Sequence, residues 1–436
     1  AALMPSYIIR SMRKMFSHCL KLSYKDTAQQ NSYVTIPRAA NSFDNTEIAA
    51  NVDEDIIDSL TGGRLVGSVT SFENFAECPL RYYLRYGVDL KEREEFTFSP
   101  VNFGVVLHAV IREVCDEIKK NGESYYLISE EKRREMVKRS VAAITDIYQN
   151  SILKDSSRNS FMIKRMEDLA DRTVWAMGEQ LKCGDFVPFV FEHKFNMEVG
   201  DGDRKQLMSG TIDRVDICEN GTDVYVRIID YKTGKKDFNI VKTYYGIDIQ
   251  LMVYMEAAMK LVAKMRPGKN VIPAGVFYYN ISDPIVSATT ESAEEIEDKI
   301  KGELRLKGMV NSDKDIVEKM DNTEGTSLNI PVSRKADGGF DSRRSKVMNT
   351  EQFNMLGRFV DVRAVDTADR IAGGDIRRSP YKDGQFSSCD RCPYGAVCGF
   401  SVDLPGCNYR KLKKFDDEVL WNNIKEGVDE NGKKMD

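Results

Sequence analysis

The stretch GTIDRVDICENGTDVYVRIIDYKTG, residues 210–234, predicts a β-hairpin with acidic residues at its open end. Asn-Gly stands between two runs of β-branched residues, and this dipeptide strongly favours a two-residue hairpin turn. The turn folds the first strand back onto the second, so Asp213 is expected to lie near Asp230. Lys232 follows Asp230 at a spacing of two and should project to the same face of the strand. Two carboxylates and one ammonium are therefore expected to converge at one spot.

This group of charges suits the metal-dependent hydrolysis of a phosphodiester. Carboxylates are the hard oxygen ligands that Mg²⁺ takes in proteins, and bound Mg²⁺ polarises a phosphoryl oxygen and lowers the pKa of water. Lys232 can orient that water or stabilise negative charge that develops at phosphorus. The alternative is a solvated Asp–Lys pair at a strand end, because the triplet D-x-K occurs by chance in most long chains.

Patterns upstream of the hairpin add two candidates. Apolar residues at helical spacing predict a helix over residues 104–120, which carries His108 four residues after Gly104. Alternating residues predict a strand over residues 189–199 with Glu192 on its polar side. A lone histidine beside an apolar stripe is more often a core or surface residue than a ligand, so His108 gains weight only from its context.

Two further helices are expected on either side of this region. Downstream, the segment IDIQLMVYMEAAMKLVAKM predicts a helix with Gln250 and Tyr254 on one face, at positions i and i+4. Upstream, Thr70 and Glu73 have the spacing of a capping box, and the helix that they open should break at Pro79.

The segment CDRCPYGAVCGF places Cys389, Cys392 and Cys398 close together. Three thiolates do not complete a four-ligand site, so the fourth ligand is either the distant Cys78 or the nearby Cys407. Structural zinc usually takes a second tight cysteine pair, whereas four cysteines in a cytosolic protein suit a [4Fe–4S] cluster. The odd total of nine cysteines, without a secretion signal, favours reduced thiols over disulfides.

The motifs GxIDRxD and IIDYKTG around an Asn-Gly hairpin resemble motifs II and III of the PD-(D/E)XK nuclease superfamily. The upstream G-x-x-x-H and downstream Q-x-x-x-Y helices resemble its RecB-like branch. The resemblance implies an α/β fold with a central mixed sheet flanked by helices, to which helical additions are attached. It implies catalytic roles for Asp213, Asp230, Lys232, Gln250 and Tyr254. It further implies that His108, Asp213 and Asp230 bind Mg²⁺ or Mn²⁺, with Glu192 as an accessory acid.

The same branch offers an answer for the fourth cysteine. Some RecB-like nucleases hold a [4Fe–4S] cluster with one cysteine before the nuclease core and three after it. The Cys-Pro and the aromatic-basic run in SFENFAECPLRYYLRYG resemble that pattern, which favours Cys78 over Cys407. The implied cluster ligands are Cys78, Cys389, Cys392 and Cys398. The cluster is expected to tie the two ends of the domain together and to take no part in the chemistry.

Within this branch the chain resembles the C-terminal part of the AddB family, the B subunits of the bacterial AddAB helicase–nucleases, from about residue 1 to 415. The resemblance implies an exonuclease that cuts the strand of 5′-to-3′ polarity while an AddA-like helicase–nuclease subunit unwinds a broken duplex end for recombinational repair. The CRISPR-associated RecB-like nucleases are an alternative, although they are usually much shorter. Two competing hypotheses of a different class are a non-cleaving DNA-binding module and a zinc-stapled interaction protein.

Net charge of −5 means that DNA should be held in a local groove rather than on a broadly basic body. Single-stranded DNA is typically contacted by basic side chains along its backbone and by aromatic rings on its bases. The candidates for these contacts are Arg81, Tyr82, Tyr83, Arg85, Lys235 and Tyr254.

The 436 residues divide into three expected parts. Residues 1–66 are expected to be the tail of an upstream helicase-like domain plus a linker, and 67–410 the nuclease domain with a charged, irregular insertion at about 290–345. Residues 411–436 are expected to form a C-terminal tail. No apolar run approaches the length of a membrane helix and no signal peptide opens the chain, which predicts a cytoplasmic protein without a membrane partner. No G-x₄-G-K-[ST] motif occurs, so this chain is not expected to hydrolyse ATP.

Overall fold

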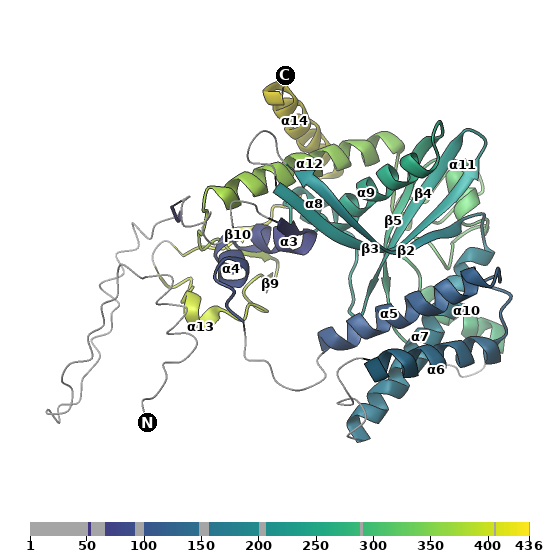
Figure 1. Ribbon diagram of the computed structural model, residues 1–436. Coiled ribbons are helices and arrows are strands. Elements are labelled where there is room, and N and C mark those ends of the chain that lie inside the picture. Colours follow the sequence, from purple (N-terminus) through teal and green to yellow (C-terminus); the bar gives the residue numbers. More distant parts are fainter. Residues whose placement is uncertain are drawn as a thin grey trace, which may run out of the picture.

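A β-sheet forms the centre of the molecule, and helices cover both of its faces (Figure 1). The computed structural model describes residues 51–53, 66–91, 100–147, 157–199, 206–287, 291–404 and 407–435. The predicted N-terminal tail and linker, residues 1–66, lie almost entirely outside the described residues. The mixed sheet between two helical layers confirms the predicted α/β fold class.

Seven strands make up the central sheet, in the order β1-β3-β4-β5-β6-β7, with β2 also paired to β3. Their bounds are β1 Val66–Ser68, β2 Val187–Val199, β3 Gln206–Asn220, β4 Asp223–Lys232, β5 Asn270–Asn280, β6 Lys307–Asn311 and β7 Val347–Met348. β3 and β4 form the predicted hairpin, which is antiparallel from Arg214↔Ile229 to Asn220↔Asp223. Its two loop residues are Gly221 and Thr222, one position beyond the predicted Asn220-Gly221 turn, because Asn220 still pairs with Asp223. Gly221 in the turn has a φ of 60°, a conformation that glycine adopts without steric cost.

Two helical layers enclose the sheet. One layer holds α5 (Pro100–Lys120), α6 (Glu130–Ile147) and α7 (Ser157–Lys182). The other holds α3 (Val69–Glu77), α9 (Gln250–Met265), α12 (Thr350–Ala372) and α14 (Asp417–Met435), and the short α8 (Ile240–Tyr244) precedes α9. None of the helices that the structure describes is long and apolar enough to cross a membrane.

β4 lies between two hydrophobic cores and is buried on both faces. Tyr225 and Ile229 belong to the core under α5 and α7, whereas Val226 and Ile228 belong to the core under α9 and α12. β4 and β5 run parallel, joined by the crossover that contains α8 and α9. Parallel strands covered on both sides read as nearly continuous apolar runs, which explains the sequence VYVRII. The carboxyl end of β4, with Asp230 and Lys232, is therefore fixed by packing from two directions.

The helix α3 begins earlier than its sequence predicts. Ser68 is the N-cap, and its side-chain oxygen accepts a hydrogen bond from the backbone N–H of Ser71 at 3.2 Å. The predicted capping box of Thr70 and Glu73 is therefore wrong, and Glu73 bonds to a different helix. The predicted break at Pro79 is confirmed, because α3 ends at Glu77 and Pro79 opens α4 (Pro79–Tyr82).

Two further segments are more regular than predicted. The span 290–345 contains α10 (Ala293–Glu303), α11 (Lys314–Met320) and β6, which pairs with β5 from Gly275↔Val310 to Tyr278↔Lys307. Part of the expected insertion is thus an ordinary strand of the central sheet, too short and too charged at its borders to show a strand pattern. The expected C-terminal tail contains α14, whose Leu420 and Ile424 are buried in the core beside α12.

A small lobe carries the clustered cysteines. It holds α4, a π-helical turn over Tyr83–Gly87, and α13 (Gly395–Cys398). It also holds a three-stranded sheet of β8 (Tyr381–Asp383), β9 (Phe386–Ser387) and β10 (Arg410–Lys411). The hydroxyl of Tyr394 donates a hydrogen bond to the carbonyl of Leu90 at 2.9 Å, so segments that are far apart in the chain meet in this lobe.

A pair of carboxyl groups lies between α9 and α12 and should make the stability of the fold depend on pH. Burial, together with the hydrogen bond to Glu256 and its charge, raises the pKa of Asp361 to about 8. Because the folded chain keeps a proton that the unfolded chain releases near pH 4, the free energy of unfolding should fall as pH rises towards and through 8.

We expect Asp361→Asn to remove this dependence. Between pH 6 and pH 9 the free energy of unfolding of the wild type should fall by about 1–2 kcal/mol more than that of the variant. This is less than the whole pKa shift would give, because the carboxyl pair is partly exposed to solvent. Urea unfolding followed by circular dichroism at the two pH values measures the difference. Asp366→Asn, on the exposed side of the same helix, is the control and should behave as the wild type does. If the free energy of unfolding changes by the same amount between the two pH values in wild type and in Asp361→Asn, the prediction is contradicted.

Candidate active site

The candidate site lies where the open end of the β3–β4 hairpin meets α5 and α9. The last paired residues of the hairpin are Arg214 and Ile229, so Asp213 and Asp230 stand one position beyond them on facing strands. The backbone N–H of Tyr231 donates to Asp213 Oδ2 at 2.6 Å, which ties the two strand ends together. Both carboxylates are buried, with Asp213 7% and Asp230 3% exposed.

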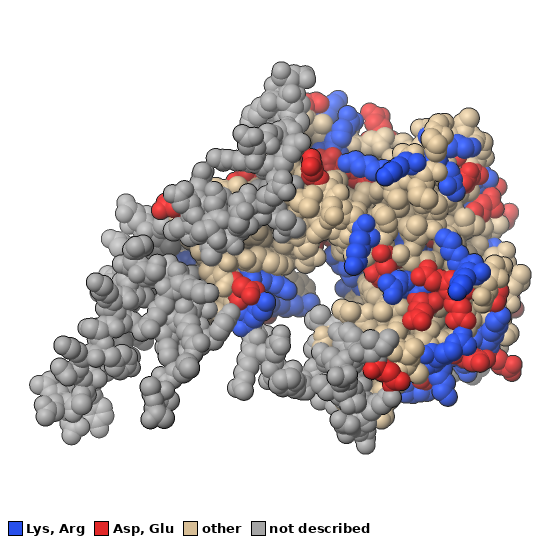
Figure 2. Space-filling view, in the orientation of Figure 1, with Lys and Arg blue, Asp and Glu red and all other residues tan. Residues whose placement is uncertain are grey.

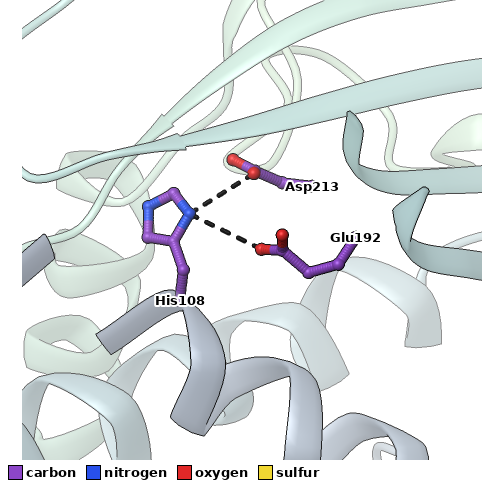
Figure 3. A group of neighbouring side chains, drawn as sticks. All are labelled: His108, Glu192 and Asp213. Carbon is purple, nitrogen blue, oxygen red and sulfur yellow. Dashed lines mark ion pairs between the residues drawn. The ribbon is translucent and has the colours of Figure 1, made fainter. Parts of the chain in front are cut away.

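Three predicted residues form one compact group of ligand atoms: His108 on α5, Glu192 on β2 and Asp213 on β3, all within 4.8 Å of one another. Both carboxylates point towards the imidazole of His108 (Figure 3), whose Nδ1 lies 3.3 Å from Asp213 Oδ1 and 3.8 Å from Glu192 Oε1. Burial alone would lower the pKa of His108, but hydrogen bonds to these carboxylates and their charges raise it to about 10. The group therefore favours positive charge, which is the property that a cation site needs.

Glu192 reaches this group through an unusual backbone conformation. It stands opposite Asp213, between the pairs Phe191↔Arg214 and His193↔Ile212, and its φ is 49°. A non-glycine residue in this left-handed region costs about 1–3 kcal/mol, and such strain concentrates at functional sites. The conformation supports the weaker prediction that Glu192 takes part in the site.

A second chain of contacts leads from Asp230 to α9. Lys232 Nζ lies 2.6 Å from Asp230 Oδ2 and donates to Gln250 Oε1 at 3.0 Å. Gln250 Nε2 in turn donates to the hydroxyl of Tyr254 at 3.0 Å. Burial and the nearby charge of Asp213 raise the pKa of Asp230 to about 6, against the opposing effect of Lys232. The four residues predicted at these positions thus form one continuous hydrogen-bonded and ionic chain.

The arrangement divides the predicted metal ligands into two neighbouring sets. Asp230 is not within the compact group of His108, Glu192 and Asp213, although its pKa responds to the charge of Asp213. Carboxylate oxygens with one imidazole are a donor set that suits Mg²⁺ or Mn²⁺. The residues present therefore fit the divalent cation that the fold family implies.

The four cysteines that the resemblance implies as cluster ligands lie along one pocket. Cys78, Cys389, Cys392 and Cys398 line one small pocket, together with Arg81 and Tyr394 among others. Burial, with smaller contributions from the neighbouring thiols of Cys78 and Cys392, raises the pKa of the Cys398 thiol to about 11. Cys407 is buried elsewhere and does not line this pocket.

The predicted DNA contacts differ in how much surface they offer. Arg85 and Lys235 are exposed, and Arg81 is paired with Glu77. Tyr82, Tyr83 and Tyr254 are each at most 8% exposed, and Tyr82 packs edge-on against Phe75. The structure gives these three rings a packing role, and little of their surface is left for DNA.

A buried polar network lies beside the site and is not among the residues predicted from the sequence. Lys236 Nζ lies 3.1 Å from Asp248 Oδ1, which also accepts a hydrogen bond from the hydroxyl of Tyr278 at 2.6 Å. Glu73 joins this network from α3. No local pattern links residues so far apart in the chain. The one available signal is that Lys236 and Asp248 flank the helix-forming segment directly after the D-x-K triplet.

The sequence-family model of the PD-(D/E)XK nuclease superfamily matches residues 67–399 of this chain. That match covers more than half of the chain, and with the geometry above it establishes that the chain belongs to this nuclease superfamily. Over most of its length the chain is also similar to the B subunit of ATP-dependent helicase/deoxyribonuclease, which confirms the predicted resemblance to the AddB family.

The identities to this B subunit are similar in three bacteria. They are 33% over 380 residues for Thermoanaerobacter sp. (strain X514), 34% over 391 for Caldanaerobacter subterraneus subsp. tengcongensis and 32% over 403 for Clostridium botulinum (strain Hall). The aligned segments cover 85%, 87% and 90% of this chain, but only 33%, 33% and 35% of the relatives. The chain therefore spans about a third of the length of these curated relatives.

Proposed function

We propose that this chain is the metal-dependent exonuclease module of a helicase–nuclease that processes broken DNA ends for recombinational repair. The observation that carries the proposal is the convergence of His108, Glu192 and Asp213 beside the Asp230–Lys232 pair. The superfamily match and the similarity to a deoxyribonuclease subunit support it.

Each residue of the site has a distinct task in this proposal. His108, Asp213 and Asp230 would hold the cation, with Glu192 as an additional acid. A divalent cation there would supply Lewis acidity towards a phosphoryl oxygen and acidify water. Lys232 forms an ion pair with Asp230 and donates one hydrogen bond to Gln250, so its ammonium can also donate to water or to a phosphate oxygen. Gln250 and Tyr254 hold Lys232 in place from α9.

We propose single-stranded DNA as the substrate and a groove next to Lys232 as part of its path. The groove has a volume of about 1210 Å³, and Thr233, Lys235 and Phe103 are among the residues that line it. Basic and acidic side chains are interspersed over the face drawn in Figure 2, and the described residues show no broad basic surface there. A local groove is therefore the better candidate for DNA binding than an extended basic face.

Cleavage of end-labelled DNA tests this proposal. Single strands labelled at the 5′ or the 3′ end should be degraded with Mg²⁺ or Mn²⁺ and remain intact with EDTA. Similarity to the helicase/deoxyribonuclease leads us to propose an AddA-like partner in the cytoplasm and cutting of the strand of 5′-to-3′ polarity. Tight DNA binding without cleavage of any DNA form, with either metal, would favour the non-cleaving binding module instead.

We also propose that Cys78, Cys389, Cys392 and Cys398 hold a [4Fe–4S] cluster. Anaerobically purified protein should be brown and contain iron and sulfide in equal amounts. Thiolate ligands join the start of the domain to its end, so Cys78→Ser should lose the colour and at least ~3 kcal/mol of stability. Cys407→Ser, at another buried thiol, is the matched control: it should keep the colour and lose less stability than Cys78→Ser. A colourless protein with bound zinc would overturn the cluster assignment.

A further inference from the structure

Glu73 on α3 holds the first turn of α9. Its Oε1 accepts hydrogen bonds from the backbone N–H of Ile249 at 2.9 Å and from that of Gln250 at 3.0 Å. The first N–H groups of a helix have no partner within the helix, and a carboxylate at this end is favoured by the helix dipole. The N-cap of α9 is Ile249, which makes no side-chain hydrogen bond, so the cap comes from Glu73 instead.

The turn that Glu73 holds is the one that orients the lysine of the site. Gln250 is the first residue of α9, and its Oε1 accepts the hydrogen bond from Lys232 Nζ at 3.0 Å. Lys232 Nζ in turn lies 2.6 Å from Asp230 Oδ2. Direct contacts therefore run without a break from the carboxylate of Glu73 through Gln250 and Lys232 to Asp230.

The position of Glu73 is itself fixed from several sides. α3 is attached to the cysteine lobe, because Ser388 Oγ donates to the carbonyl of Glu77 at 3.3 Å and Arg410 donates to the carbonyl of Ala76. Burial and Asp248 raise the pKa of Glu73 to about 7, while Lys236 and Lys232 oppose that change. A carboxyl group that is partly protonated still offers a carbonyl oxygen, so the cap does not depend on full ionisation.

We propose that Glu73 is a positioning residue for the cleavage reaction, which acts by capping α9 so that Gln250 holds Lys232 beside Asp230. This inference rests on the proposed nuclease function. It links the helix that precedes Cys78 to the catalytic lysine, although Glu73 lies 177 residues before Gln250. Misplacement of a catalytic group by about 1 Å can cost ~10²-fold in rate, so loss of the cap should appear mainly in kcat.

Steady-state cleavage of a short single strand by the full chain, with any partner subunit that it requires, tests the inference. Glu73→Ala should lower kcat about 10- to 100-fold and change KM by less than about 3-fold. Glu73→Gln should recover most of the rate, because its amide oxygen accepts the same two hydrogen bonds. Thr70→Ala, an exposed position on the same helix, should match the wild type. Equal rates for Glu73→Ala and wild type overturn the inference, as do equal losses in Glu73→Ala and Glu73→Gln.

Two further readouts separate positioning from general damage. Glu73→Ala combined with Gln250→Ala should be no slower than Gln250→Ala alone, because both changes act through one contact. Lys232 should also react faster with an amine-acylating reagent in Glu73→Ala than in wild type or Glu73→Gln, as measured by mass spectrometry. If the wild type cuts no DNA, the proposed function fails, but the labelling still tests whether Glu73 positions Lys232. Equal labelling of Lys232 in wild type and Glu73→Ala overturns the inference. Additive effects in the double variant also overturn it.

Discussion

Replacing Asp230 with asparagine will lower the rate of DNA cleavage by at least ~10³-fold, a loss of about 4 kcal/mol in transition-state stabilisation. Asp230 is 3% exposed and its Oδ2 lies 2.6 Å from Lys232 Nζ. The amide has nearly the same shape, so the packing of β4 is kept while the negative charge is removed. That charge is needed both to help hold the cation and to keep Lys232 in its place. The pKa of Asp230 is about 6, so the carboxylate is ionised in an assay at pH 8.

The comparison requires a variant that alters a carboxylate of the same strand away from the site. Asp223 opens β4 at the far end of the hairpin, where it accepts an exposed hydrogen bond from Asn270 at 3.1 Å. Asp223→Asn should cut DNA at the wild-type rate, and all three proteins should have the same circular dichroism spectrum. Cleavage by Asp230→Asn within about 10-fold of the wild-type rate would remove Asp230 from the catalytic machinery.

The hairpin is the part of the site that local sequence predicts most completely. The sequence places a turn at Asn220-Gly221, whereas the pairing of Asn220 with Asp223 leaves Gly221 and Thr222 as the loop residues. The hairpin itself follows from local sequence, but the register that sets Asp213 opposite Asp230 is shifted by one loop residue from the predicted turn. Lys232 then follows from the two-residue period of the strand. Gln250 and Tyr254 are equally local, because one helical turn separates them. Local patterns thus group Asp230 with Lys232 and Gln250 with Tyr254, but only the tertiary contact between Lys232 and Gln250 joins the two groups.

The rest of the site depends on contacts that no local pattern records. Glu192 faces His108 from a backbone with a φ of 49°, a conformation that strand alternation does not predict. The spacing of Thr70 and Glu73 predicts a cap within one helix, but Glu73 caps a helix 177 residues further on. The segment of β6 reads as irregular because it is short, and its place in the sheet depends on pairing with β5. In each case tertiary packing overrides the preference of the local sequence.

The largest loss of stability is expected from Asp216→Ala, in the same strand as Asp213. Asp216 is fully buried, and its Oδ2 lies 2.6 Å from Arg214 Nη2 and 2.9 Å from Arg227 Nε. Burial alone would raise the pKa of Asp216, but the charges of the two arginines lower it. Its ionised form therefore stabilises the fold above about pH 4, and that contribution is lost as pH falls through the lowered pKa.

Removing the carboxylate leaves two guanidinium groups, each 1% exposed, without their shared counter-charge. Breaking a buried ion pair in this way typically costs ~3–5 kcal/mol, which is a large part of the stability of an ordinary domain. Urea unfolding at pH 7 measures the loss. Asp185→Ala, whose exposed carboxylate lies 3.1 Å from Lys319, is the control and should cost less than ~1 kcal/mol. Replacing Arg214 and Arg227 by methionine in the Asp216→Leu background should restore much of the stability, because apolar side chains of similar volume carry no charge to desolvate. If Asp216→Ala costs no more than Asp185→Ala, the buried ion group does not stabilise the strand that carries Asp213.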